Sequence, residues 1–282
     1  MQVCSRPRRP CRASRGIIRR AARPLAALGL AWLAAGCAGI GPTAQNERQD
    51  IIDRIVASSA KIIIEQGGRR VGSGSGVVVA SRPAGPEGDA VSFVLTATHI
   101  LEGWEGSQVF VRFPGAPGER GKFPAALRHR APSATLDLAV LEVRGVSLPA
   151  VSIPATDEIR LGEEILIVGF PWGKRLALFS GIVSQVPLGG TEDALAGEVA
   201  DQTLVVDAAS SKGVSGGGVF LAASGSLVGI VEGYQTASIA VKEQSRTFSV
   251  KVPMPGETFV VPLGRIRDYL AGARLEPPSG RP

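Results

Sequence analysis

The side chains best suited to proton transfer in this sequence are its two histidines, His99 and His129. The ordinary pKa of imidazole lies close to neutral pH, so histidine often acts as a general base or acid. His99 follows the apolar run Val91–Thr96, and a rigid strand there can hold a side chain at a cleft. His129 stands between two arginines in what we expect to be a charged surface loop. His99 is therefore the candidate base.

A candidate nucleophile, Ser215, lies in the glycine-rich segment GVSGG at 213–217. A serine hydroxyl needs a neighbouring base, a carboxylate that orients the base, and N–H donors for the oxyanion. Glycines allow the backbone to turn its N–H groups inward, although a plain glycine-rich turn is the alternative. The segment also fits the G-x-S-x-G elbow of α/β-hydrolases, but that fold has its histidine after the serine. No histidine follows Ser215, which excludes this alternative.

The candidate carboxylate is Asp137, at the start of the apolar segment DLAVL. A carboxylate that opens a buried strand loses hydration unless a partner compensates, and a histidine N–H is a suitable partner. An ordinary strand-start aspartate in a turn is the alternative. The order His, Asp, Ser therefore remains for nucleophilic catalysis.

The segments that must position these residues are short, apolar and separated by Gly, Pro, Ser or Asp, a pattern that predicts β-strands. Many short strands without intervening helices predict a sandwich or barrel. Helices are expected only at Glu47–Ala57 and Arg265–Leu270. The predicted strands are 61–65, 76–80, 91–96, 108–113, 139–143, 165–170, 181–186, 204–207, 218–221, 227–232 and 259–262.

The start of the chain has the composition of an export signal. Eight arginines in the first 24 residues precede eleven apolar residues, LAALGLAWLAA, at 25–35. As a helix this run rises about 16 Å, well short of the ~30 Å hydrocarbon core of a bilayer. The small residues before Cys37 are similar to a lipobox, after which the cysteine is lipidated. We expect lipidation of Cys37, with an ordinary cleaved signal or an uncleaved anchor as alternatives.

The charge distribution argues against a nucleic-acid partner. The 282-residue chain has a formal charge of +6, but eight of its 31 basic residues are the early arginines. All 25 acidic residues follow them, so the remaining chain has 23 basic and 25 acidic residues. The sequence contains neither H-E-x-x-H nor C-x-x-C, so we expect no metal site and no cofactor.

Motifs across about residues 60–270 resemble the chymotrypsin-fold serine proteases, most closely the bacterial Do-like (HtrA-type) branch. In order they are GSGSG at 72–76, TATH at 96–99, DLAVL at 137–141, GEEILIVGFPWG at 162–173, GIVS at 181–184, DAA at 207–209 ahead of GVSGG, LVGI at 227–230 and FVVP at 259–262.

This resemblance implies an all-β fold of two six-stranded antiparallel barrels, with a short N-terminal and a short C-terminal helix and a catalytic cleft between the barrels. It implies that His99 is the general base, Asp137 orients it, and Ser215 attacks the peptide carbonyl. The N–H groups of Gly213 and Ser215 would form the oxyanion hole. The expected organisation is a signal peptide with lipobox at 1–36, the lipidated Cys37 with tether and short helix at 37–58, a protease domain at 59–272 and a Pro-rich tail at 273–282.

Three features depart from the family pattern. Val214 and Gly218 stand where the family usually has Asn or Asp and Pro, which bears on the shape of the oxyanion loop. We expect no PDZ domain. The stretch Tyr234–Glu257 has no strong family match and is predicted to be a surface hairpin or an active-site flap.

The resemblance also locates a specificity pocket, which is walled by 208–212 and 230–234. Cleavage after Arg or Lys would need an acid at the position of Ala209, because a buried cation without a counter-charge is costly. Tyr234 narrows the pocket beside Gly233, which predicts cleavage after small or medium aliphatic residues. The carboxylate of Glu232 points toward the catalytic residues or, alternatively, into the pocket.

Together these features predict a membrane-tethered serine endopeptidase of the cell envelope that cleaves unfolded or envelope proteins. The alternative is a protease-like lipoprotein that binds proteins, in a chaperone-like role, without cleaving them. Ala38 replaces the aspartate of an inner-membrane retention signal, which predicts an outer-membrane anchor. The expected partners are polypeptides and, through Cys37, a membrane; no oligomeric state is predicted.

Overall fold

The computed structural model describes most of the chain after residue 41. Residues 1–36, Cys37 and the end of the predicted tail lie outside the described residues. The described ranges are 42–86, 88–104, 106–114, 121–156, 159–187, 203–243 and 246–275.

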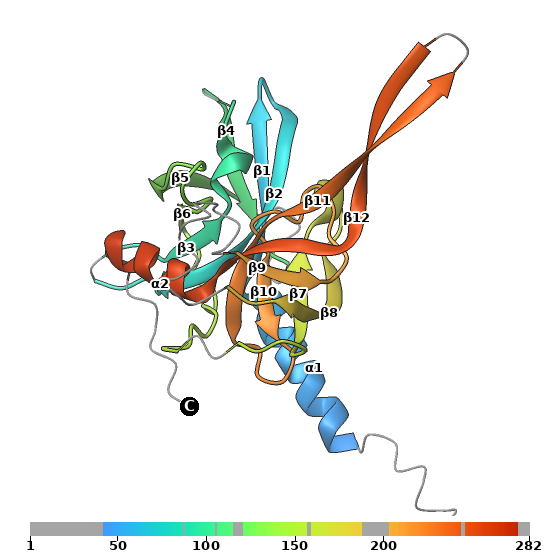
Figure 1. Cartoon of the computed structure of the whole chain (residues 1–282). Helices are drawn as coiled ribbons and strands as arrows, with labels where there is room; N and C mark the ends of the chain where they lie inside the picture. Colours follow the sequence, from blue (N-terminus) through green and yellow to red (C-terminus); the bar gives the residue numbers. More distant parts are fainter. Residues whose placement is uncertain are drawn as a thin grey trace, which may run out of the picture. The chain divides into compact units, whose positions relative to one another are not determined.

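The first half of the chain forms a closed antiparallel barrel with the strand order β1-β2-β3-β6-β5-β4 (Figure 1). Closure comes from β1, which pairs with β2 on one edge and with β4 on the other. A short 3-10 helix, η2 (Thr98–Leu101), follows β3. The strands are β1 (Ser59–Gln66), β2 (Arg69–Arg82), β3 (Val91–Thr96), β4 (Gln108–Arg112), β5 (Lys122–Arg130) and β6 (Ala139–Arg144).

The second half forms another closed antiparallel barrel with the order β10-β11-β12-β9-β8-β7. A tight turn, η3 (Pro171–Gly173), lies between β7 and β8. Helix α1 (Pro42–Ala57) precedes the first barrel, and α2 (Leu263–Gly272) follows the second. The strands are β7 (Glu164–Gly169), β8 (Ala177–Gln185), β9 (Leu204–Asp207), β10 (Gly218–Leu221), β11 (Leu227–Glu243) and β12 (Arg246–Pro262).

Three apolar clusters hold this fold together. One cluster, which includes Ile62 and Val94, belongs to the first barrel, and a second, which includes Ile167 and Val260, belongs to the second. The largest cluster joins the barrels, because buried residues of both contribute to it, and α1 and α2 pack against it through Ile55 and Ile266. Burial of this shared surface fixes the two barrels against each other, so residues at their junction have defined positions.

The structure confirms the predicted pair of six-stranded barrels and the two short helices. Each of the eleven predicted strands is present, and the sequence pattern missed β5. His129 therefore lies in a strand, with its ring 5.1 Å from that of Tyr269, and the expectation of a loop there is wrong. Helix α1 starts at Pro42, five residues before the predicted start. Among the described residues, no helix is both long enough and apolar enough to cross a membrane.

Candidate active site

His99 and Asp137 form a close pair at the end of the first barrel. Asp137 Oδ2 lies 2.5 Å from Nδ1 of His99, and Oδ1 accepts the backbone N–H of His99 at 2.8 Å. The Asp137 side chain is 4% exposed and that of His99 is 41% exposed. The Thr98 hydroxyl, which donates to Leu138 O at 2.6 Å, ties the two segments together. A proton on Nδ1 toward the carboxylate leaves Nε2 free to accept one.

The surroundings of His99 favour its protonated form. The hydrogen bond that His99 donates to Asp137 raises the pKa of His99 above its ordinary 6.5, while partial burial opposes the effect. The negative charges of Asp137, Glu232 and Glu102 raise it further. His99 therefore accepts a proton more readily than a solvated histidine does.

Ser215 lies in the loop that leads into β10, beside the end of β3. Its carbonyl accepts the N–H of Ser75 at 2.9 Å, and the next residue, Gly216, donates to Val231 O at 2.7 Å. Gly216 has a φ of +81°, and a Cβ there would overlap Ser75 O and Thr96 Oγ1. The loop therefore needs glycine to come this close to the strand before His99. No hydrogen bond joins Ser215 to His99, both of which the structure describes.

The predicted oxyanion donors, the N–H groups of Gly213 and Ser215, make no hydrogen bond within the described ranges. Each N–H points opposite to the preceding carbonyl, because the peptide unit is planar and trans. The carbonyl of Lys212 accepts the N–H of Trp172 at 2.7 Å, and that of Val214 accepts the N–H of Gly217 at 2.8 Å. These bonds fix both peptide planes and leave the two N–H groups without a partner among the described residues.

Ser75 is a site residue that the sequence analysis did not identify. It is fully buried in β2, and its hydroxyl donates to Gly213 O at 2.8 Å and accepts the N–H of Phe170 at 2.9 Å. One side chain of the first barrel thus holds the oxyanion loop and the end of β7 in the second barrel. The sequence feature that could have identified Ser75 is the GSGSG motif at 72–76. A serine that is buried between glycines in an apolar strand needs hydrogen-bond partners.

The turn η3 supports the same loop from the other side. Trp172, which donates to Lys212 O, is a non-glycine residue in the left-handed region with φ 57° and ψ 18°. Arg70 Nη1 donates to Gly173 O at 2.8 Å, and Lys61 Nζ donates to Lys174 O at 3.1 Å. Two cationic side chains of the first barrel thereby restrain this strained turn.

Val214 and Gly218, which depart from the family pattern, fit their surroundings. Val214 is fully buried in the core of the second barrel. At Gly218 a Cβ would overlap the ring of Phe220 and a methyl group of Val77. Packing therefore accounts for both residues.

The four predicted pocket residues lie on two segments. Ala209 is exposed in the loop after β9, whereas Glu232, Gly233 and Tyr234 are half-buried in β11. A Cβ on Gly233 would meet no atom within 4 Å, so this position faces open space. Burial, followed by the charge of Asp137, raises the pKa of Glu232, while the charge of His99 lowers it. The Glu232 carboxyl is therefore electrostatically coupled to the predicted catalytic pair.

Strand β12 adds a wall to this region that the sequence analysis did not include. Buried Thr258 pairs with Tyr234 and donates its hydroxyl to Ala208 O at 2.9 Å. The hydroxyl of Ser210 in the neighbouring loop is buried and has no hydrogen-bond partner in the part of the chain that the structure describes.

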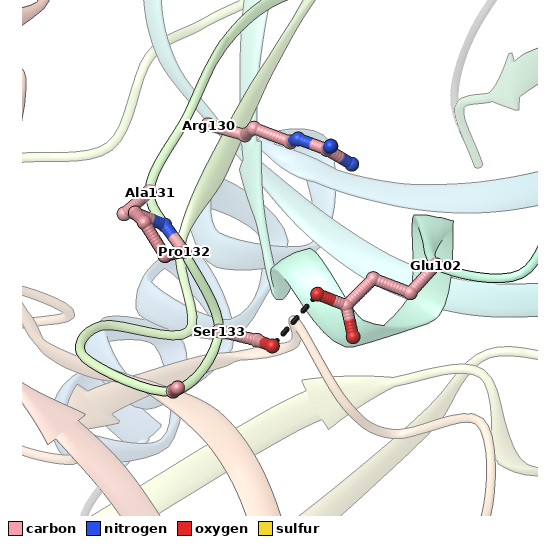
Figure 2. Close-up of a pocket in the computed structure, with 6 residues that line it drawn as sticks. Glu102, Arg130, Ala131, Pro132 and Ser133 are labelled. Carbon is pink, nitrogen blue, oxygen red and sulfur yellow. Dashed lines mark hydrogen bonds between the residues drawn. The ribbon is translucent and has the colours of Figure 1, made fainter.

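A separate cavity of about 340 Å³ lies beside η2 (Figure 2). Its lining includes Glu102, three residues after His99, and the loop before Asp137, in which Ser133 donates to Glu102 at 2.7 Å. None of the predicted pocket residues lines it. In the described ranges, no three His, Cys, Asp or Glu side chains are grouped so that they could hold a metal ion.

Comparison with known proteins identifies similar sequences and a similar fold. A model of the trypsin-like peptidase domain matches residues 74–230. A serine protease Do-like HtrA of Bacillus subtilis (strain 168) is 28% identical over 170 residues, which is 56% of this chain and 33% of that protein. A probable periplasmic serine endoprotease, DegP-like, of Marinomonas sp. (strain MWYL1) is 28% identical over 189 residues, or 67% of this chain and 35% of that protein. The chain thus spans about a third of the length of these two relatives.

The crystal structure of the serine endoprotease from Yersinia pestis has the same fold, with a TM-score of 0.58 and 18% identity. The match covers 80% of this chain and 66% of that one.

Proposed function

Because the chain belongs to the trypsin-like peptidase family, we propose that it is a serine endopeptidase in which Ser215, His99 and Asp137 carry the reaction. The observation that carries this proposal is the pairing of His99 with both oxygens of buried Asp137, beside a serine loop that has two free N–H groups. A histidine with a purely structural role does not require a buried carboxylate partner together with an adjacent serine loop.

The reaction follows from these groups. Nε2 of His99 removes the hydroxyl proton as Ser215 Oγ bonds to the peptide carbonyl carbon. The N–H groups of Gly213 and Ser215 stabilise the negative oxygen of the tetrahedral intermediate. Protonated His99 then gives its proton to the leaving amine, and the C–N bond breaks to form an acyl-enzyme. Water repeats the cycle and releases the acid with Ser215 regenerated.

Substrate choice is proposed to depend on Ala209, Glu232, Gly233 and Tyr234. Ala209 supplies no negative charge for a bound cation, and Tyr234 limits the depth of the site. We expect cleavage after small or medium aliphatic residues, which sequencing of the fragments from a digested unfolded protein will measure. Cuts mainly after Arg and Lys would mean that Glu232 faces the pocket and sets the specificity.

The proposal extends to location. The name of one relative describes it as a probable periplasmic endoprotease, which supports an envelope location. The predicted signal peptide at 1–36 and lipidation at Cys37 would tether the protease domain, 59–272, to a membrane, and Ala38 favours the outer one.

The proposal is tested by labelling the full chain with a fluorophosphonate probe, which reacts only with an activated serine. We expect labelling of the native protein and none of Ser215→Ala. His99→Ala and Asp137→Ala should each lose casein cleavage, by about four or more orders of magnitude, while His129→Ala keeps it. An unlabelled native protein would instead support the non-catalytic, protein-binding alternative.

A further inference from the structure

The hairpin formed by β11 and β12 extends beyond the second barrel (Figure 1). Within the barrel, β11 pairs with β10 over Leu227–Ile230 and β12 pairs with β9 over Thr258–Val260. From the pair Thr236 and Pro253 outward, the two strands pair only with each other in the described part of the chain. An isolated two-stranded ribbon is only marginally stable in water.

One face of this hairpin is apolar. Directly opposed residues of antiparallel strands share a face, and the face alternates along the strand. Three apolar pairs therefore lie on one face: Ala237 with Val252, Ile239 with Val250, and Val241 with Phe248. Ile239, Phe248, Val250 and Val252 are each between 38% and 51% exposed.

The opposite face is small and polar, with the pairs Ser238 with Lys251 and Ala240 with Ser249. Exposed contiguous apolar surface on a protein marks a site of interaction.

The outer edge of β11 is also unpaired. Val231 exchanges hydrogen bonds with Gly216 and Gly217, the residues that follow the proposed nucleophile Ser215. Beyond Val231, no described strand pairs with this edge up to Glu243. A free strand edge accepts an extended peptide as an additional strand. The free edge thus begins beside the candidate active site and continues along the hairpin, past register shifts between Val231 and Gly233 and between Tyr234 and Thr236.

Resting on the proposed function, we propose that the edge of β11 beyond Tyr234, together with the apolar face of the hairpin, binds the part of an extended substrate polypeptide that precedes the scissile bond. The substrate class is an unfolded segment with apolar side chains at alternate positions, the pattern of a strand from a disrupted β-sheet core. About nine residues along β11, at about 3.3 Å each, give a contact some 30 Å long. Backbone pairing supplies affinity, and alternate apolar contacts supply selection.

Continuity with the serine loop favours a substrate over two other occupants. Contact with a second copy of the chain would not require the free edge to start at the proposed catalytic residues. A membrane is disfavoured by the position of α1, because Arg54 donates to Ser224 O in the turn before β11. The part of α1 around Arg54 therefore lies at the opposite end of β11 from the hairpin tip.

The test measures binding of a fluorescein-labelled twelve-residue peptide that alternates Val with Thr or Lys. Fluorescence anisotropy is recorded with the full-length Ser215→Ala protein, which cannot cleave it. We expect the added pair of changes Ile239→Thr and Val250→Thr to weaken binding at least tenfold. The matched control, Ala240→Thr with Ser249→Thr on the adjacent pair of the opposite face, should keep the affinity within twofold. Equal affinities for the two variants would overturn the proposal.

A second peptide with the same sequence but N-methyl groups on alternate residues tests the strand pairing. N-methylation removes backbone donors, so we expect at least tenfold weaker binding to the Ser215→Ala protein. Unchanged binding would overturn the edge-pairing mechanism. Light scattering provides a further check: a dimer that becomes a monomer with the Ile239→Thr and Val250→Thr pair would assign the face to a second copy and contradict the proposal.

The two experiments distinguish a failure of this inference from a failure of the proposed function. If the fluorophosphonate probe labels Ser215 but the two variant pairs bind the peptide equally well, the docking inference fails and the proposed function stands. If the probe does not react but only the Ile239→Thr and Val250→Thr pair weakens peptide binding, the proposed function fails and the hairpin binds polypeptides without catalysis.

Discussion

The hydroxyl of Ser75 uses both of its hydrogen-bonding capacities within the protein, and the backbone N–H of the same residue binds Ser215 O. A loop rich in glycine has many conformations open to it, and these bonds favour the one in which the N–H groups of Gly213 and Ser215 are free. The positions of His99, Asp137 and Ser215 in the sequence were enough to predict a site. The GSGSG motif indicated that Ser75 needs hydrogen-bond partners, but the partners themselves were not predictable, because they are distant in sequence.

Removal of the Ser75 hydroxyl should lower kcat much more than it changes KM. Ser75→Ala leaves Gly213 O and the N–H of Phe170 without their partner, so the oxyanion loop loses its fixed shape. We expect kcat to fall about 10- to 100-fold with KM nearly unchanged, measured with a peptide substrate. Ser73→Ala, two residues earlier in β2, is the matched control and should retain kcat. Equal losses in the two variants would argue against a positioning role.

The pH dependence of activity should follow His99, which must be neutral to accept a proton. Because Asp137 raises the pKa of His99, kcat/KM should increase with pH through a midpoint above 6.5. Glu232→Gln removes a negative charge that stabilises the protonated ring, so the midpoint should shift to lower pH. A pH profile of kcat/KM measures this shift, with Glu163→Gln as a control that leaves it unchanged. An unmoved midpoint in Glu232→Gln would contradict the coupling.

At the scale of the elements, strands that contain a continuous apolar run were predictable, and a strand whose residues are mostly exposed was not. The eleven predicted strands contain apolar runs, whereas β5 has the sequence KFPAALRHR, in which five consecutive residues from Ala126 are exposed. The hairpin beyond Tyr234 lacks a core for a different reason, since both of its faces meet solvent. Its register, and hence its apolar face, becomes clear only from the pairing of β11 with β12.

Strand β10 offers a test of packing at this scale. A methyl group at Gly218 would overlap the ring of Phe220 and Val77, so Gly218→Ala should destabilise the fold by about 1–3 kcal/mol. Thermal unfolding should show a lower Tm. Gly272→Ala is the control, because a Cβ there has no atom within 4 Å and alanine is the better helix former. A Tm of Gly218→Ala equal to that of the native protein would refute packing as the reason for a glycine at this position.

At the scale of the whole molecule, the shared core could not be predicted from strand patterns alone. Strand β6 is apolar on both faces, with Val140 in the core between the barrels and Leu141 in the core of the first barrel. When both faces of a strand are apolar, its sequence does not reveal which face packs into which core. The junction that carries the candidate site therefore required the structure.

The proposed membrane tether is a property of the whole chain. If Cys37 carries the lipid, the full-length protein expressed in a bacterium should incorporate labelled palmitate, and Cys37→Ser should not. Ser215→Ala should be labelled like the native protein, which separates tethering from activity. Persistent labelling of Cys37→Ser would rule out the lipobox.

The bonds from Ser75 to the serine loop span two barrels that leave the ribosome at different times. His99, Asp137 and Ser75 all belong to the first barrel, whereas the serine loop and its neighbour Val231 come from the last third of the chain. If these residues act as proposed, a nascent chain that contains only the first barrel holds the groups that would activate the nucleophile but lacks Ser215 itself. The proposed activity would therefore arise only after the second barrel has been synthesised and folded.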